Sequence, residues 1–125
     1  GNDMSSRDIE GQNPLYLPQA KTYDGCGGLG PCIYVPQNPS EEPFEIHLSI
    51  ERAGSIIFQE SISTYKMKRK PQELVDYLFR ESSFPNGAFL MTGTGIVPPA
   101  DFSLALSDIV SIEIEKIGTL TNPVA

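Results

Sequence analysis

The chain has 125 residues, which suits a single domain with a hydrophobic core of its own. Sixteen acidic residues outnumber nine basic ones, and the net charge of −7 argues against nucleic acid and against an anionic membrane surface as partners. No apolar run approaches the length of a membrane-spanning helix. Two cysteines are too few for a disulfide framework, so we expect a reducing, cytoplasmic setting.

Residues 1–31 are predicted to form a long polar loop. Ser6 can start a short helical turn that ends at Gly11, but Pro14 and Pro18 prevent a longer helix. A long loop in a compact domain is typically either functional or disordered. The apolar side chains within this loop favour a functional one.

Three strand patterns follow the loop. Residues 30–36 form a short apolar run bounded by prolines and are predicted to be a strand. Residues 44–51 alternate between apolar and polar side chains, which is the period of a half-buried strand. A turn at Ala53 and Gly54 leads to a returning strand over residues 55–61, so we expect a hairpin.

The second half of the chain predicts one helix and more strands. Apolar residues at helical spacing after a proline predict a helix over 71–81. Residues 87–95 are predicted to be a buried strand that runs into a Gly-Thr loop, and residues 110–120 alternate, with a turn near 116–118. The fold class is therefore mainly β or α+β, with a mixed sheet and one main helix. The expected core contains Phe44, Ile46, Leu48, Ile50, Ile112 and Ile114.

Histidine and cysteine, the nitrogen and sulfur ligands or nucleophiles of many active sites, are few in this chain. The single histidine, His47, lies on the polar face of its strand and is interpreted as a surface residue. Cys26 and Cys32 match no metal-binding spacing and are interpreted as small buried side chains. A basic cluster before the helix is interpreted as solvated charge in preference to an anion site; its members are Lys66, Lys68, Arg69 and Lys70.

Oxygen ligands offer the stronger signal. The first loop carries several carboxylates together with two basic side chains, namely Asp3, Arg7, Asp8, Glu10, Lys21 and Asp24. Carboxylates suit Mg²⁺, Mn²⁺ or Ca²⁺, and a lysine beside such an ion can hold an oxyanion or act as a base. The string MTGTGIVPP offers hydroxyls and flexible glycine amides, which can cradle a carboxylate or a phosphate. The same residues can equally cap turns, so composition leaves both interpretations open.

Four strings in order, NDMSSRDIEGQNPLYLPQAKTYD, GP, LMTGTGIVPP and DIVSIEIEKIGTLTNPV, resemble the fumarylacetoacetate hydrolase family over nearly the whole chain. The segment around NPLYLPQAK is most similar to the branch of 2-keto-3-deoxy sugar-acid dehydratases. The resemblance implies a β-sheet roll of the type found in the C-terminal domain of that family. It also implies a Mg²⁺-dependent enzyme that acts on a small 2-oxo acid and forms a homodimer.

The resemblance also implies roles for individual residues. Asp3 matches the carboxylate that binds the divalent cation, and Lys21 matches an active-site lysine with a catalytic role. Arg7 and Glu10 fall where relatives have residues that face the substrate, and Thr94 matches a threonine that contacts the substrate carboxylate.

Three features depart from the family pattern. Gln12 stands where close relatives often have Glu, which bears on fine substrate specificity, and Ser107 precedes Asp108 where Gly is common, which we interpret as a turn. Family members are also longer, and their other metal carboxylates come from a Glu-x-Glu motif upstream of the position of Asp3. We therefore expect residues 1–125 to be a single domain, the C-terminal part of a catalytic domain, and to be inactive alone. An acylpyruvate-type C–C hydrolase and a non-catalytic scaffold remain as alternative functions.

Overall fold

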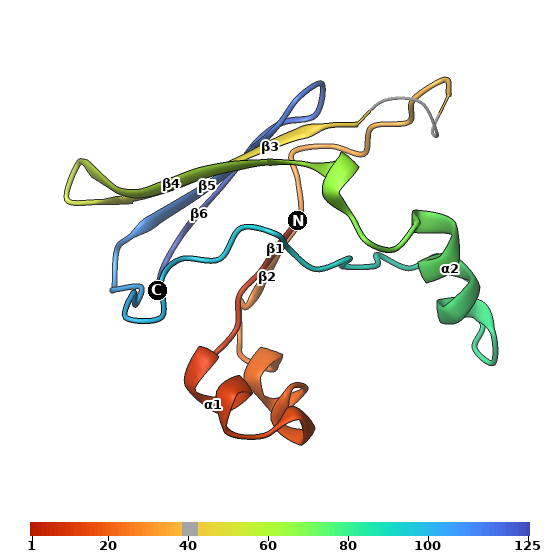
Figure 1. Cartoon of the computed structure of the whole chain (residues 1–125), viewed down its shortest axis with the longest axis horizontal. Helices are drawn as coiled ribbons and strands as arrows, with labels where there is room; N and C mark the ends of the chain where they lie inside the picture. Colours follow the sequence, from red (N-terminus) through yellow and green to blue (C-terminus); the bar gives the residue numbers. More distant parts are fainter. Residues whose placement is uncertain (39–42) are drawn as a thin grey trace.

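A computed structural model describes residues 1–38 and 43–125, and its main element is a four-stranded sheet. The strands lie in the order β4-β3-β5-β6, and each neighbouring pair is antiparallel (Figure 1). A second sheet pairs two very short strands, β1 and β2. The bounds are β1 (Asn2–Asp3), β2 (Gly27–Gly28), β3 (Glu45–Arg52), β4 (Ser55–Ser63), β5 (Ile109–Ile114) and β6 (Gly118–Pro123).

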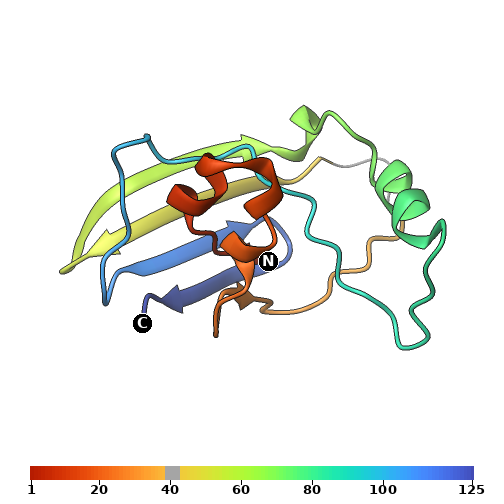
Figure 2. The same cartoon turned by 90° about the horizontal axis from the view of Figure 1, so that it is seen from below.

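The helices lie outside the four-stranded sheet. Figure 2 shows α1 and the turns after it in front of the sheet, and α2 beyond one end of it. Pro71 occupies the first turn of α2, where its missing N–H costs no hydrogen bond, and Leu74 and Leu78 are its half-buried apolar residues. The bounds are α1 (Arg7–Gln12), α2 (Pro71–Phe79) and the 3₁₀ turns η1 (Pro14–Tyr16), η2 (Gln19–Lys21) and η3 (Thr64–Lys66). None of the described helices has the length and apolar character needed to cross a membrane.

The predicted fold class is confirmed, although the sheet is antiparallel at each described pairing where we expected a mixed one. Both hairpins occur as predicted, and the helix predicted over 71–81 ends at Phe79. The prediction that residues 1–31 are a loop is wrong in part, because α1 forms where a helical turn is possible and β1 pairs with β2 across the segment.

Two predicted strands are absent from the described structure. Residues 30–36 and 87–95 run without strand pairing, and Ile33 and Val35 are 76% and 80% exposed. In the first segment the flanking prolines cannot donate hydrogen bonds to a neighbouring strand. In the second, Gly87 and Gly93 adopt positive φ values of 83° and 84°, which are incompatible with a regular strand.

One face of the sheet collects the apolar side chains. The register places Ile46 opposite Ile114, and Ile50 opposite Val110. Ile50 and Val110 are buried, whereas the other five predicted core residues are half-buried. The alternation therefore identified the correct face but overstated how much of it is covered.

A buried carboxylate joins the strands at one end of the sheet. Asp108 is fully buried, and it accepts hydrogen bonds from Arg52 Nε at 2.8 Å and Arg52 Nη2 at 2.7 Å. The Ala105 amide donates a third, also at 2.8 Å. The hydrogen bonds from Arg52 lower the pKa of Asp108 to about 2, against the opposing effect of burial. Ser107 before it has φ of 71°, so the expected turn is present.

Asp108 should make the stability of the protein sensitive to acid. Its pKa in the unfolded chain is about 3.9, above the folded value, so its contribution is complete above about pH 5 and is lost as the pH falls toward 2. We expect the urea midpoint of Asp108→Asn to be lower at neutral pH and to fall less steeply with acid. Asp101→Asn, at an exposed carboxylate, should keep the wild-type slope. An unchanged slope in Asp108→Asn would contradict this account.

Candidate active site

A lysine, an aspartate and a serine meet beside the short β1–β2 ladder. Lys21 Nζ donates to Asp3 Oδ2 at 2.7 Å and to Ser5 Oγ at 2.6 Å. The side chains of Lys21 and Asp3 are 32% and 37% exposed, so a small molecule can reach them. We call Asp3, Ser5 and Lys21 the lysine cluster.

Backbone hydrogen bonds hold the cluster together. The Met4 amide donates to the Cys26 carbonyl at 2.9 Å, and the Ser6 amide donates to the carbonyl of buried Ala20 at 2.8 Å. The Cys26 thiol also lies 2.9 Å from the Lys21 carbonyl, where it can donate. The segment that carries Asp3 is therefore fixed against the segment that carries Lys21.

A pair of asparagines attaches β1 to the four-stranded sheet. Asn2 is buried, and its Nδ2 donates to Oδ1 of Asn122 on β6 at 3.2 Å. Asn122 lies opposite Val110, on the apolar face of the sheet. Gly28, the pairing partner of Asn2, leaves room for this contact, since a Cβ there would lie 2.8 Å from Asn122 Oδ1.

The other predicted site residues have separate partners. Arg7 Nη1 donates to the carbonyls of Pro98 and Pro99 at 3.1 and 2.8 Å, so α1 is tied to the loop after the Gly-Thr motif. The Thr94 hydroxyl lies 3.1 Å from the Ile96 amide and 3.2 Å from the Ile96 carbonyl. Glu10 is exposed, and its side chain has no polar partner within the described residues.

The structure thus brings Asp3 and Lys21 into direct contact and places Arg7 and Glu10 on α1. The Thr94 loop begins beside β1, because a Cβ on Gly1 would lie 2.8 Å from the Met91 sulfur. Sequence reasoning missed Ser5. Its position two residues after Asp3 on an extended segment was the available signal, since alternate residues share a side.

The described residues do not form a complete metal site. Across residues 1–38 and 43–125, no three His, Cys, Asp or Glu side chains lie close enough together to hold a metal ion. Mg²⁺ needs several oxygen ligands. Asp3 Oδ2 is bonded to Lys21, while Oδ1 accepts no hydrogen bond in the described part of the chain. Asp3 therefore has a carboxylate oxygen that could serve as one of the several oxygen ligands of a Mg²⁺ ion.

The remaining candidates lie outside the cluster. His47 is exposed, with Nδ1 2.6 Å from the hydroxyl of Ser61, so its interpretation as a surface residue is confirmed. Both cysteines are free thiols. Cys26 is half-buried, but Cys32 is exposed, and its interpretation as a buried residue is wrong because residues 30–36 do not pack as a core strand.

Comparison of the sequence with known proteins identifies the family. Residues 1–125 match the model of the family described as Fumarylacetoacetate (FAA) hydrolase C-terminal. The chain belongs to the fumarylacetoacetate hydrolase family. The predicted resemblance is thereby confirmed, and the match covers every position from Gly1 to Ala125.

Members of the family named as dehydratases are similar to this chain. A probable 2-keto-3-deoxyxylonate dehydratase from Haloferax volcanii is 49% identical, over 99% of this chain and 43% of its own length. The 2-dehydro-3-deoxy-D-arabinonate dehydratase of Saccharolobus solfataricus is 47% identical, over 98% of this chain and 42% of its own. The chain thus spans less than half the length of these curated relatives.

A solved structure gives the same similarity in three dimensions. It is 2-keto-3-deoxy-D-arabinonate dehydratase complexed with magnesium and 2,5-dioxopentanoate, with 47% identity and a TM-score of 0.90. The superposition covers 97% of this chain and 43% of that one. The α+β architecture described above is therefore shared with the family.

Two adjacent glycines test how the cluster is positioned. Gly28→Ala should destabilise the protein by about 1–3 kcal/mol, because the new methyl group displaces Asn122 from its hydrogen bond with Asn2. Gly27→Ala is the matched control, since a Cβ there meets nothing within 4 Å, and it should change stability by less than about 1 kcal/mol. Urea unfolding measures both variants. Equal effects would contradict the assigned role of the asparagine pair.

Proposed function

We propose that residues 1–125 are the C-terminal part of the catalytic domain of a Mg²⁺-dependent enzyme that dehydrates a 2-keto-3-deoxy sugar acid. The observation that carries the proposal is the similarity to a dehydratase solved with magnesium and 2,5-dioxopentanoate, a 2-oxo acid. It extends over 97% of this chain at 47% identity. The lysine cluster adds a partly exposed cation–carboxylate pair of the kind that such chemistry requires.

Asp3 is proposed to supply one carboxylate ligand of the magnesium ion, through the oxygen that is not bonded to Lys21. When bound, the ion acts as a Lewis acid that polarises the oxygens of a 2-oxo acid. The described residues contain no group of three or more His, Cys, Asp or Glu side chains that could hold the ion, so the other protein ligands are proposed to come from elsewhere in the intact enzyme.

Lys21 is proposed to act at the reacting end of the substrate. An ammonium group carries three hydrogens, and two of them are directed at Asp3 and Ser5. The third is available to a substrate oxygen, where a fixed positive charge stabilises developing negative charge and can deliver a proton. Because both acceptors hold the ammonium in place, little reorganisation is needed when a substrate binds.

Thr94, Arg7 and Glu10 are proposed to contact the substrate. The Thr94 hydroxyl can keep the hydrogen bond from the Ile96 amide and turn its own hydrogen from the Ile96 carbonyl to a substrate carboxylate. Arg7 uses Nη1 for the carbonyls of Pro98 and Pro99, which leaves Nη2 available. Glu10 follows on the same short helix with its carboxylate exposed.

We also propose that the intact protein is a cytoplasmic homodimer. Residues 1–125 alone are proposed to be inactive. Free thiols at Cys26 and Cys32 suit a reducing compartment. Large apolar side chains such as Leu15, Tyr65 and Phe89 are between 68% and 85% exposed in the described chain, which suits further protein contacts. Light scattering on the intact protein measures its oligomeric state.

Replacing the metal ligand should abolish both binding and turnover. In the intact protein, Asp3→Ala removes a carboxylate oxygen, so we expect weaker Mg²⁺ binding by calorimetry and no measurable dehydration of 2-keto-3-deoxy sugar acids. His47→Ala, at an exposed side chain on β3, is the control and should leave both unchanged. Normal magnesium affinity in Asp3→Ala would remove Asp3 from the metal site.

Replacing the lysine separates catalysis from metal binding. Lys21→Met keeps the length of the side chain but removes its charge and hydrogens, and we expect kcat to fall on the order of a hundredfold or more. Magnesium should still bind, because Asp3 is retained. Wild-type turnover by Lys21→Met on a panel of 2-keto-3-deoxy sugar acids and acylpyruvates would remove Lys21 from the mechanism.

A further inference from the structure

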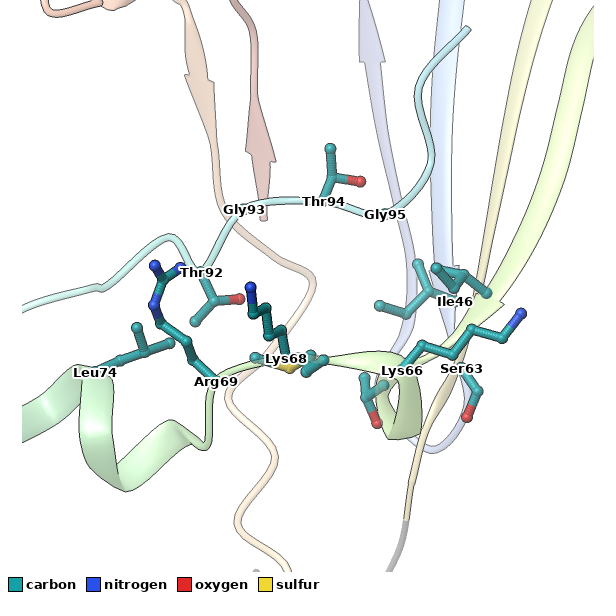
Figure 3. Close-up of a pocket in the computed structure, with 13 residues that line it drawn as sticks. Ile46, Ser63, Lys66, Lys68, Arg69, Leu74, Thr92, Gly93, Thr94 and Gly95 are labelled. Carbon is teal, nitrogen blue, oxygen red and sulfur yellow. The ribbon is translucent and has the colours of Figure 1, made fainter.

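A cleft lies between the Gly-Thr loop and the segment that joins β4 to α2. Its volume is about 370 Å³ (Figure 3). Its lining comes from Ile46 of β3, from the end of β4 and Thr64, from residues 66–69, from Leu74 of α2 and from residues 92–95. A volume of this order suits a small molecule. The cleft contains none of the lysine cluster.

The charged residues that line the cleft are all basic. They are Lys66, Lys68 and Arg69, and no acidic residue lines it in the described part of the chain. Within the same part, none of the three forms an ion pair or a side-chain hydrogen bond, whereas Lys21, Arg7 and Arg52 all have partners. In a protein of net charge −7, three uncompensated cations in one concave site repel one another and attract an anion.

Neutral hydrogen-bond donors lie across the cleft from these cations. Figure 3 shows Lys68 and Arg69 extending toward the loop at Thr92, with the hydroxyl of Thr92 on the same side. Gly93 has φ of 84°, a turn that suits oxyanion binding by successive amides. Among the described residues, the amides of residues 92–95 donate no hydrogen bond to a protein acceptor.

We propose that this cleft binds the phosphate group of a small molecule. A guanidinium presents two parallel N–H groups to two phosphate oxygens, and a lysine ammonium adds a point charge, so Arg69 and Lys68 together match a dianion. A singly charged carboxylate leaves part of the positive charge uncompensated. Thr94 also lines the cleft, so the cleft adjoins the proposed substrate site. Figure 3 shows the Thr94 side chain on the opposite side of the loop from Lys68, so the cations and the Thr94 hydroxyl face different sides of the loop.

Inorganic phosphate is the probe that tests the cleft. In the intact protein, titration calorimetry at constant ionic strength should give a Kd of about 1 mM or tighter. Lys68→Gln and Arg69→Gln should each weaken binding by about tenfold, equal to about 1.4 kcal/mol. Lys70→Gln is the matched control, since Lys70 belongs to the same basic segment but does not line the cleft, and its affinity should stay within about twofold of wild type.

Three results would overturn the proposal. The first is the absence of phosphate binding by the intact protein. The second is an equal loss of affinity in Lys70→Gln, which would indicate a diffuse positive field instead of a site. The third is displacement of phosphate by pyruvate in the presence of Mg²⁺, which would assign the cleft to the 2-oxo acid. Because Lys68 and Arg69 are exposed, their variants should fold, and unchanged thermal midpoints verify this. Failure here leaves the proposed dehydratase function standing, since that rests on Asp3 and Lys21.

Discussion

The structure depends on one buried carboxylate, that of Asp108. Arg52 at the end of β3 and the Ala105 amide both donate to this carboxylate. The backbone carbonyl of Asp108 accepts a hydrogen bond from the Val124 amide, just after β6. Two segments that are distant in sequence therefore converge on Asp108, Arg52 at its side chain and Val124 at its backbone carbonyl. The outer strand fixed in this way, β6, carries Asn122, which in turn holds β1 and its Asp3. A buried charge that is fully hydrogen-bonded is thus connected, through β6 and Asn122, to the strand that carries Asp3.

The sequence predicted the elements whose side chains obey a clear period, and failed where pairing depends on distant partners. Alternation between residues 44 and 51 identified β3 because one face of that strand is covered. The apolar runs at 30–36 and 87–95 have the composition of strands, but prolines in one and left-handed glycines in the other prevent pairing. The β1–β2 ladder was missed because two residues are too few to show a period.

The candidate site was predictable as a set of residues but not as an arrangement. Resemblance to a family assigned Asp3 and Lys21 to one site, and only the structure places their charged atoms 2.7 Å apart. That contact spans eighteen positions in sequence, so no local pattern encodes it. Ser5 carried no chemical signal of its own, and it enters the site through the lysine that it holds. The Arg7 partners were unpredictable for a simpler reason, since they are backbone carbonyls.

Gly95 links the loop to the sheet beneath it. A Cβ at this position would collide with the side chain of Ile62 on β4, so the loop rests directly on that isoleucine. The size of the Ile62 side chain therefore determines the distance between the loop and β4. Because the colliding atom is the terminal methyl group of Ile62, a side chain at position 95 requires that methyl group to move or to be removed. The loop borders the cleft with Lys68 and Arg69, and at Met91 it lies beside Gly1, which precedes β1. A shift of the loop relative to β4 therefore changes both the cleft and the contact beside β1.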